Sequence, residues 1–81
     1  MNRTDIANAV KDVIVSILPS VRTDEIRGDR HIRDLGADSV DRVEIIATLL
    51  QKLKLKLPLA DFSALKDIDA LIDYLCAACE R

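Results

Sequence analysis

Three segments of this 81-residue chain repeat aliphatic side chains at spacings of three and four, the pattern of helices with one buried face. The spacing predicts helices over residues 4–18, over residues 39–54 and after Asp67. Apolar residues make up 49% of the chain and aromatic residues only 2%, so these faces must pack into an aliphatic core. A chain of this length is expected to form one domain, residues 1–81, with an all-α fold.

The connections between these helices differ in length. Residues 19–37 make a long, charged connection, which we expect a few apolar side chains to hold against the core. These side chains are Ile26, Ile32 and Leu35. Residues 54–57 alternate like a strand but run into a proline, which favours an extended link, and residues 59–64 can form a short helix. The expected architecture is a small bundle of three main helices plus one short helix, with a long first connecting loop.

Capping residues predict where the helices begin. Thr4 is the expected cap of the first helix, and Pro19 ends it because the residue before a proline avoids helical geometry. Asp38 is the expected cap of the second helix, with Asp41 three residues later in the spacing of a capping box. Asp67 is the expected cap of the last helix. The second helix should therefore start at the serine that follows Asp38.

The spacing also predicts which side chains face the core. The buried stripe of the second helix is expected to comprise Val43, Ile46, Leu49 or Leu50, and Leu53. Ile45 and Ala47 lie beside that stripe and could line a cavity or face a partner. The inner face of the last helix is expected to comprise Ile68, Leu71, Ile72, Leu75 and Cys79.

Charge and composition exclude several classes of protein. The net charge of −2 and the 2% of aromatic residues give no basis for binding nucleic acid. No apolar run approaches the roughly 20 residues of a membrane span. No hydrophobic signal segment follows the N-terminus, so we expect a cytoplasmic protein, and we expect it to be a monomer.

The two cysteines and the single histidine are expected to have no catalytic role. Cys76 and Cys79 have C-x-x-C spacing, but a redox motif would stand at a helix N-terminus after a strand, and zinc would need two further ligands. We expect structural, partly buried thiols. His31 is expected to be a loop residue. The sequence therefore predicts no metal site and no catalytic residue.

The segment from Leu35 to Glu44 carries the most specific chemistry. Gly36 allows a sharp turn, and Ser39 follows at the start of an amphipathic helix with acidic residues on both sides. The N–H groups of a helix N-terminus favour a phosphate, so a serine held there can carry a phosphodiester-linked group. A purely structural serine at a helix start is the common alternative.

This segment resembles the attachment motif of acyl carrier proteins, Leu-Gly-x-Asp-Ser-Leu followed by an acidic helix. Residues 35–39 read Leu-Gly-Ala-Asp-Ser, Val40 replaces the usual leucine, and the similarity covers nearly the whole chain. The resemblance implies that a phosphopantetheinyl transferase moves 4′-phosphopantetheine from coenzyme A to Ser39, and that the thiol of this arm holds acyl groups as thioesters. It implies a carrier and not an enzyme. The alternative is a small helical interaction domain with an unmodified serine.

The motif also resembles particular subclasses of the family. Gly-Ala-Asp-Ser at residues 36–39 is similar to fatty-acid and polyketide carriers rather than to the Gly-Gly-His-Ser or Gly-Gly-Asp-Ser of peptide synthetases. Residues 38–44 and 57–59 look similar to discrete carriers of polyketide β-branching cassettes, which bring malonyl and then acetyl units to a hydroxymethylglutaryl-synthase-like enzyme. We expect a freestanding carrier in polyketide biosynthesis, with a carrier of fatty-acid synthesis as the alternative.

Two groups on the second helix are candidate contacts for partner enzymes. The first surrounds the serine and comprises Asp38, Val40, Asp41, Arg42 and Glu44. The second ends the helix, where the family commonly has glutamates, and comprises Lys52 and Lys54, with Lys56 just beyond. The lysines are either ordinary solvated charge or a means of selecting dedicated partners. The resemblance implies a phosphopantetheinyl transferase, an acyltransferase and ketosynthase-like or hydroxymethylglutaryl-synthase-like enzymes as partners.

Overall fold

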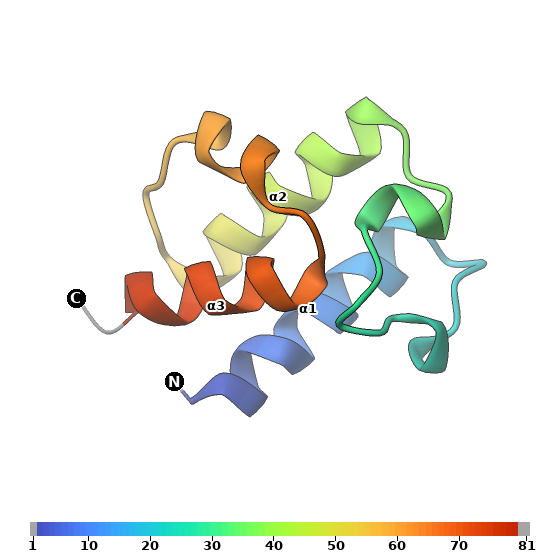
Figure 1. The fold of residues 1–81 in the computed structure, drawn as a ribbon, viewed down its shortest axis with the longest axis horizontal. Coiled ribbons are helices and arrows are strands. Elements are labelled where there is room, and N and C mark those ends of the chain that lie inside the picture. Colours follow the sequence, from blue (N-terminus) through green and yellow to red (C-terminus); the bar gives the residue numbers. More distant parts are fainter. Residues whose placement is uncertain (1, 80–81) are drawn as a thin grey trace.

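The computed structural model describes residues 2–79, which form helices joined by loops (Figure 1). The helical elements are α1 (Arg3–Ile17), η1 (Thr23–Glu25), η2 (Ile32–Leu35), α2 (Ser39–Leu53), η3 (Leu59–Ala64) and α3 (Ile68–Cys79), of which the η elements are 3₁₀ helices. No strand occurs among the described residues, and none of their helices has the length and apolar character needed to cross a membrane. The predicted all-α bundle of three main helices, with a short helix over residues 59–64, is confirmed, and the long first connection also contains the short helices η1 and η2, which were not predicted.

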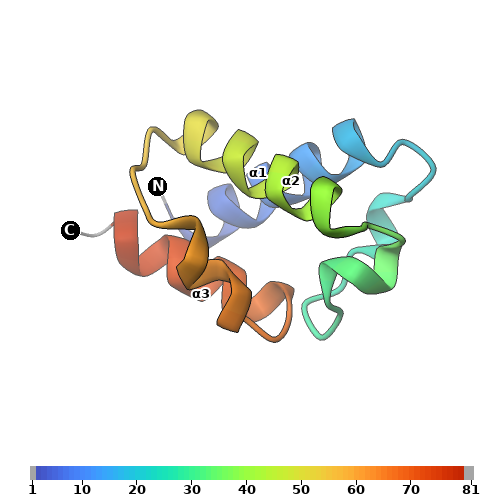
Figure 2. The ribbon, with the colours of Figure 1, turned by 90° about the horizontal axis from the view of Figure 1, so that it is seen from above.

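The core lies where α1 meets the other two main helices. α1 packs against α2 and against α3, and η3 packs against α2. Figures 1 and 2 show that α2 and α3 both run opposite to α1, so α2 begins at the end of the bundle where α1 finishes. The largest fully buried side chains are Ile6, Val10, Ile14, Ile45, Leu49 and Leu75. The core is therefore aliphatic, as the composition predicts.

α1 begins one residue earlier than its spacing predicts, and its cap is Asn2 rather than Thr4. The Asp5 N–H donates to Asn2 Oδ1 at 2.8 Å, and the Asn2 N–H donates to Asp5 Oδ2 at 3.4 Å. Thr4 stands inside the helix because a capping box needs its cap three positions before the acid. The expected cap of α3 is confirmed, since the Ala70 N–H donates to Asp67 Oδ1 at 2.8 Å.

The buried face of α2 is rotated relative to the predicted stripe. Ile45 is 0% exposed, whereas Val43 is 51% exposed, so the prediction that Val43 belongs to the core is wrong. The buried residues of α2 are Ile45, Ile46, Leu49 and Leu53. This face is broader than one stripe because α2 packs against both α1 and η3. Val43 is left at the surface on the serine side of the helix.

The inner face of α3 and the cysteines largely follow the prediction. Ile68, Leu71, Ile72 and Leu75 are buried, and Cys79 is half-buried at the edge of the core. Cys76 is also half-buried, and both thiols are free. No group of three metal-ligating side chains occurs within residues 2–79. The purely structural role of Cys76 and Cys79 stays a prediction.

The long first connection is held in place by its apolar side chains and by hydrogen bonds to α3. Ile26 and Ile32 are buried, as predicted, and Leu35 packs partly against the core. The Ile68 N–H donates to the Arg30 carbonyl at 2.8 Å, and the next N–H, from Asp69, donates to the Gly28 carbonyl at 2.9 Å. These loop carbonyls satisfy donors that the first turn of α3 would otherwise leave without partners.

Gly28 lies directly against the side chain of Asp69, which also forms an ion pair with Arg3 at 3.6 Å. A Cβ at position 28 would overlap the Asp69 carboxylate. We expect Gly28→Ala to lower the free energy of unfolding by about 1 kcal/mol in urea titrations. The cost should shrink in an Asp69→Ala background, where the obstructing side chain is gone. An equal cost in both backgrounds would show that the close packing of Gly28 on α3 is unimportant.

Candidate functional site

The start of α2 is fixed by a glycine turn followed by a capping box. Gly36 ends η2 with φ +95°, a conformation that side-chain-bearing residues rarely adopt. Two residues later, Asp38 Oδ1 accepts the Asp41 N–H at 2.8 Å, and the Asp38 N–H donates to Asp41 Oδ2 at 3.4 Å. The predicted cap and box are therefore confirmed, and Ser39 is the first residue of the helix.

The hydroxyl of Ser39 is exposed and free to react. Within residues 2–79 it takes part in no hydrogen bond, and the N–H groups of Ser39 and Val40 likewise have no partner. A phosphate on this oxygen would lie at the positive end of a 15-residue helix, where free N–H groups favour an anion. The residues at this position fit a phosphodiester-linked group.

Apolar side chains flank the serine on the surface. Val40, Val43 and Leu59 are 70%, 51% and 47% exposed. An open hollow lies over Val40, Val43 and Ala47 beside Ser39 and Glu44. An exposed apolar patch next to a reactive hydroxyl is typical of a surface that a partner protein covers.

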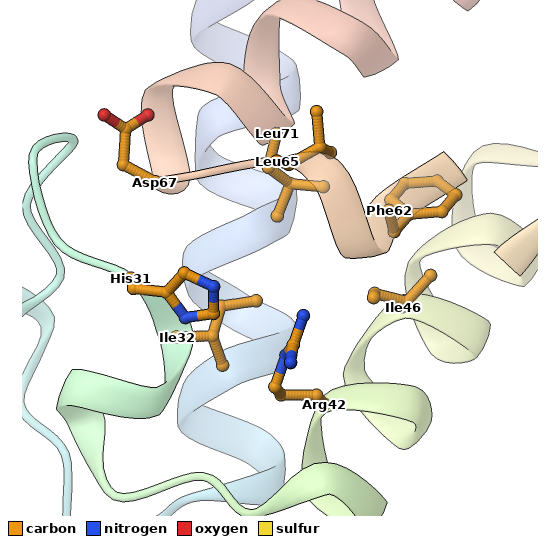
Figure 3. Close-up of a pocket in the computed structure, with 8 residues that line it drawn as sticks. All are labelled: His31, Ile32, Arg42, Ile46, Phe62, Leu65, Asp67 and Leu71. Carbon is orange, nitrogen blue, oxygen red and sulfur yellow. The ribbon is translucent and has the colours of Figure 1, made fainter. Parts of the chain in front are cut away.

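A cleft leads from the serine into the molecule between α2 and η3. It has a volume of about 170 Å³ and is lined by Ser39, Arg42, Val43, Ile46, Leu59, Phe62 and Ser63. Beyond it lies a smaller space of about 20 Å³, the inner pocket, shown in Figure 3. Its lining residues are His31, Ile32, Arg42, Ile46, Phe62, Leu65, Asp67 and Leu71. Arg42, Ile46 and Phe62 line both spaces, so the two adjoin.

The charged candidates form two groups at opposite ends of α2. The acidic group lies around the first one and a half turns of the helix, where Asp38 and Glu44 are exposed and Asp41 is half-buried. Lys52 and Lys54 are exposed at its other end, about 20 Å away at the rise of an α-helix. Neither lysine takes part in an ion pair among the described residues. The structure thus keeps the acidic and basic groups apart.

His31 has a more defined place than the sequence predicts. It caps η2: Nδ1 accepts the Arg33 N–H at 3.1 Å, and the His31 N–H donates to Asp34 Oδ2 at 3.1 Å. Its ring also forms one wall of the inner pocket, opposite Arg42 (Figure 3). Asp34 follows His31 at the same spacing as Asp41 follows Asp38, so the cap had a sequence signal. No sequence pattern indicated that the His31 ring lies close to Arg42.

The comparison with known proteins agrees with this geometry. Residues 8–75 match the family model described as phosphopantetheine attachment site. A polyketide biosynthesis acyl carrier protein, AcpK, of Bacillus subtilis (strain 168) is 39% identical over 62 residues, which cover 76% of each chain. An acyl carrier protein of Clostridium perfringens is 36% identical over 73 residues, covering 89% of this chain and 95% of the relative. One of Chlorobium phaeovibrioides is 34% identical over 76 residues, covering 93% and 96%. No solved structure gave a significant match.

The chain belongs to the acyl carrier protein family. Members of this family are not enzymes, and their phosphopantetheine-binding domain carries covalently attached 4′-phosphopantetheine. The predictions of family, cofactor and absence of enzymatic activity are therefore confirmed. The cytoplasmic location and the monomeric state stay predictions.

The histidine beside the site should make folding sensitive to acid. Burial lowers the pKa of His31 below its ordinary value of 6.5, and the cations of Arg42 and Arg33 lower it further, against smaller opposite effects of Asp34 and Asp67. The unfolded chain therefore takes up this proton at a higher pH than the folded protein. The stability contributed by neutral His31 is present above pH 6.5 and is lost as the pH falls through that value toward the folded-state pKa.

His31→Asn should reduce this loss of stability. An asparagine oxygen can accept the Arg33 N–H in the way that Nδ1 does, but it does not titrate. Between about pH 7 and pH 5, the free energy of unfolding of the variant should therefore fall less than that of the unmodified sequence. Urea titrations at several pH values measure this, and parallel pH profiles for the two proteins would contradict it.

Proposed function

We propose that this chain carries acyl groups as thioesters on a 4′-phosphopantetheine arm attached to Ser39. The observation that supports it most is the exposed hydroxyl of Ser39, which makes no hydrogen bond to any residue that the structure describes and lies within the Asp38–Asp41 capping box. The arm supplies the thiol that holds the acyl group. The residues of the chain hold the acceptor oxygen at the surface and keep the helix N-terminus directed at the phosphate.

The start of α2 is the proposed contact for the phosphopantetheinyl transferase and for enzymes that load the arm. Asp38, Asp41 and Glu44 give this end of the helix negative charge, and Val40 and Val43 add an apolar surface beside the serine. Opposite charges on an enzyme would steer association, while the valines would be covered in the complex. Arg42 is half-buried and its side chain also lines the inner pocket (Figure 3), and its contact with these enzymes stays a prediction.

A role in polyketide biosynthesis is the finer proposal, with malonyl or acetyl delivery for β-branching as its most specific form. The similarity to the Bacillus subtilis polyketide carrier supports it. The exposed lysines at the end of α2 support a dedicated partner, such as a hydroxymethylglutaryl-synthase-like enzyme, because they would repel a basic enzyme surface. Fatty-acid synthesis is the second candidate, because Gly-Ala-Asp-Ser at residues 36–39 is similar to fatty-acid as well as to polyketide carriers.

Ser39→Ala should abolish attachment of the arm without unfolding the protein. Ser39 is exposed and its hydroxyl makes no hydrogen bond within residues 2–79, so its removal should change the free energy of unfolding by less than about 0.5 kcal/mol. Ser63→Ala is the matched control, because Ser63 lines the same cleft and its hydroxyl donates only to the Ala60 carbonyl. The measurement is the intact mass of each protein after incubation with coenzyme A and a broad-range transferase, which shows whether the arm has been added. Modification of Ser39→Ala, or none of the unmodified sequence, would contradict the proposal and favour an unmodified interaction domain.

Replacing the lysines at the end of α2 should separate partner choice from arm attachment. A Lys52→Glu, Lys54→Glu, Lys56→Glu variant should transfer its acyl group to the dedicated partner at least tenfold more slowly, since charge reversal removes about 1.4 kcal/mol or more of attraction. Attachment of the arm, which engages the other end of α2, should change little. The control is a Lys52→Gln, Lys54→Gln, Lys56→Gln variant. It removes the three positive charges without placing acids at the helix C-terminus, where they are unfavourable. Equal effects on both rates would mean that the lysines are ordinary surface charge.

A further inference from the structure

Arg42 places a cation inside the protein next to apolar side chains. Its guanidinium reaches into the inner pocket, between Ile32 on one side and Ile46 on the other (Figure 3). Arg42 is half-buried and belongs to none of the ion pairs within residues 2–79. Moving a charged group toward an apolar environment without a partner is costly, so an arginine in this position favours an anion beside it.

The charged groups around the pocket do not supply that anion. Asp67 stands at the rim, but its Oδ1 accepts the Ala70 N–H at 2.8 Å and its carboxylate points away from Arg42 (Figure 3). His31 faces Arg42 from η2 with Nδ1 already occupied by the Arg33 N–H. The other lining residues are apolar: Ile32, Ile46, Phe62, Leu65 and Leu71. The pocket therefore presents one cation whose hydrogen-bond donors are available.

The position of Arg42 connects this pocket to the proposed attachment site. Ser39 and Arg42 are three residues apart on α2, so they lie on one face of the helix, and both line the α2–η3 cleft. The cleft, about 170 Å³, is lined mainly by Val43, Ile46, Leu59 and Phe62, which suit an aliphatic chain. The inner pocket of about 20 Å³ accepts a group of one or two heavy-atom positions, since about 10–15 Å³ holds one water. The two oxygens of a carboxylate would occupy that space, with the carboxylate carbon in the adjoining cleft.

We propose that Arg42 binds the free carboxylate of a carboxyacyl cargo, an acyl group derived from a dicarboxylic acid, when the arm on Ser39 folds back into the cleft. The inference rests on the proposed function, since it assumes an arm on Ser39, and it adds the residue that would recognise a carboxyacyl cargo, the class to which the malonyl group belongs. The thioester end stays toward Ser39, the aliphatic part contacts Val43 and Phe62, and the carboxylate pairs with the guanidinium. The arm's own phosphodiester is the other anion nearby, but the free N–H groups of Ser39 and Val40 already suit it.

The test compares three loaded forms of the full chain. One carries the arm alone, one carries a succinyl group and one carries the uncharged succinamoyl group, each joined through an amide in place of the thioester so that the cargo stays attached. Intact mass verifies loading. The succinyl form should unfold about 4 °C higher than the succinamoyl form, and the Arg42 Nε–H resonance in ¹H–¹⁵N spectra should shift in the succinyl form only.

Variants then separate Arg42 from general charge. Arg42→Gln should remove the difference in unfolding temperature between the succinyl and succinamoyl forms, whereas Lys52→Gln, which removes an exposed cation from the same helix, should keep it. Because the resonance shift is measured on the unmodified sequence, it stands even if Arg42→Gln fails to fold.

Three results would overturn the inference. Equal unfolding temperatures of the succinyl and succinamoyl forms would mean that the carboxylate is not bound. A shift of the Arg42 resonance on attachment of the arm alone would assign the arginine to the phosphodiester. If the protein gains no arm, as measured by intact mass, the proposed function is contradicted and the cargo site with it. If the loaded succinyl and succinamoyl forms unfold at the same temperature, the cargo site alone is contradicted.

Discussion

The geometry of the site depends on where α2 begins. Gly36 turns the chain at φ +95°, and the Asp38–Asp41 box then sets Ser39 as the first helical residue. If the helix began one residue later, Ser39 would no longer be held in helical geometry one turn before Arg42 and Val43, and its place beside the surface patch and the cleft would not be fixed. The docking of the long connection on α3, through the carbonyls of Gly28 and Arg30, holds the segment that leads into this turn.

The faces and the ends of α2 contribute to different parts of the structure. One face supplies the core through Ile45 and Leu49, and another lines the cleft through Arg42 and Ile46. The exposed surface is acidic at the start and basic at the end, and the valines beside Ser39 provide apolar area without belonging to the core. Folding and the proposed contacts with cargo and partners therefore involve different sides of one helix, with Ile46 shared by the core and the cleft and Val43 shared by the cleft and the exposed patch.

Local rules account for most of the fold, and tertiary packing accounts for what the sequence alone missed. The caps Asp38 and Asp67 and the buried face of α3 were predictable because they depend on nearby residues. The face of α2 was not, since its burial depends on two neighbours, α1 and η3, whose directions no local pattern encodes. The approach of His31 to Arg42 across the Gly36 turn likewise depends on tertiary packing that no local pattern encodes. The spacing along α2 places Arg42 one turn after Ser39, but it does not show that residues of the long connection and of η3 complete a pocket around its side chain.

Peptide mapping of the protein loaded by a transferase locates the phosphopantetheine arm, which we propose is attached to Ser39. Trypsin cleaves after Arg33 and Arg42, which releases residues 34–42, and Ser39 is the one hydroxyl-bearing residue of that peptide. The mass of the arm should appear on this peptide and, on fragmentation, at the serine. An arm on any other peptide, or a fully unmodified 34–42 peptide from a protein that has gained the mass, would contradict it.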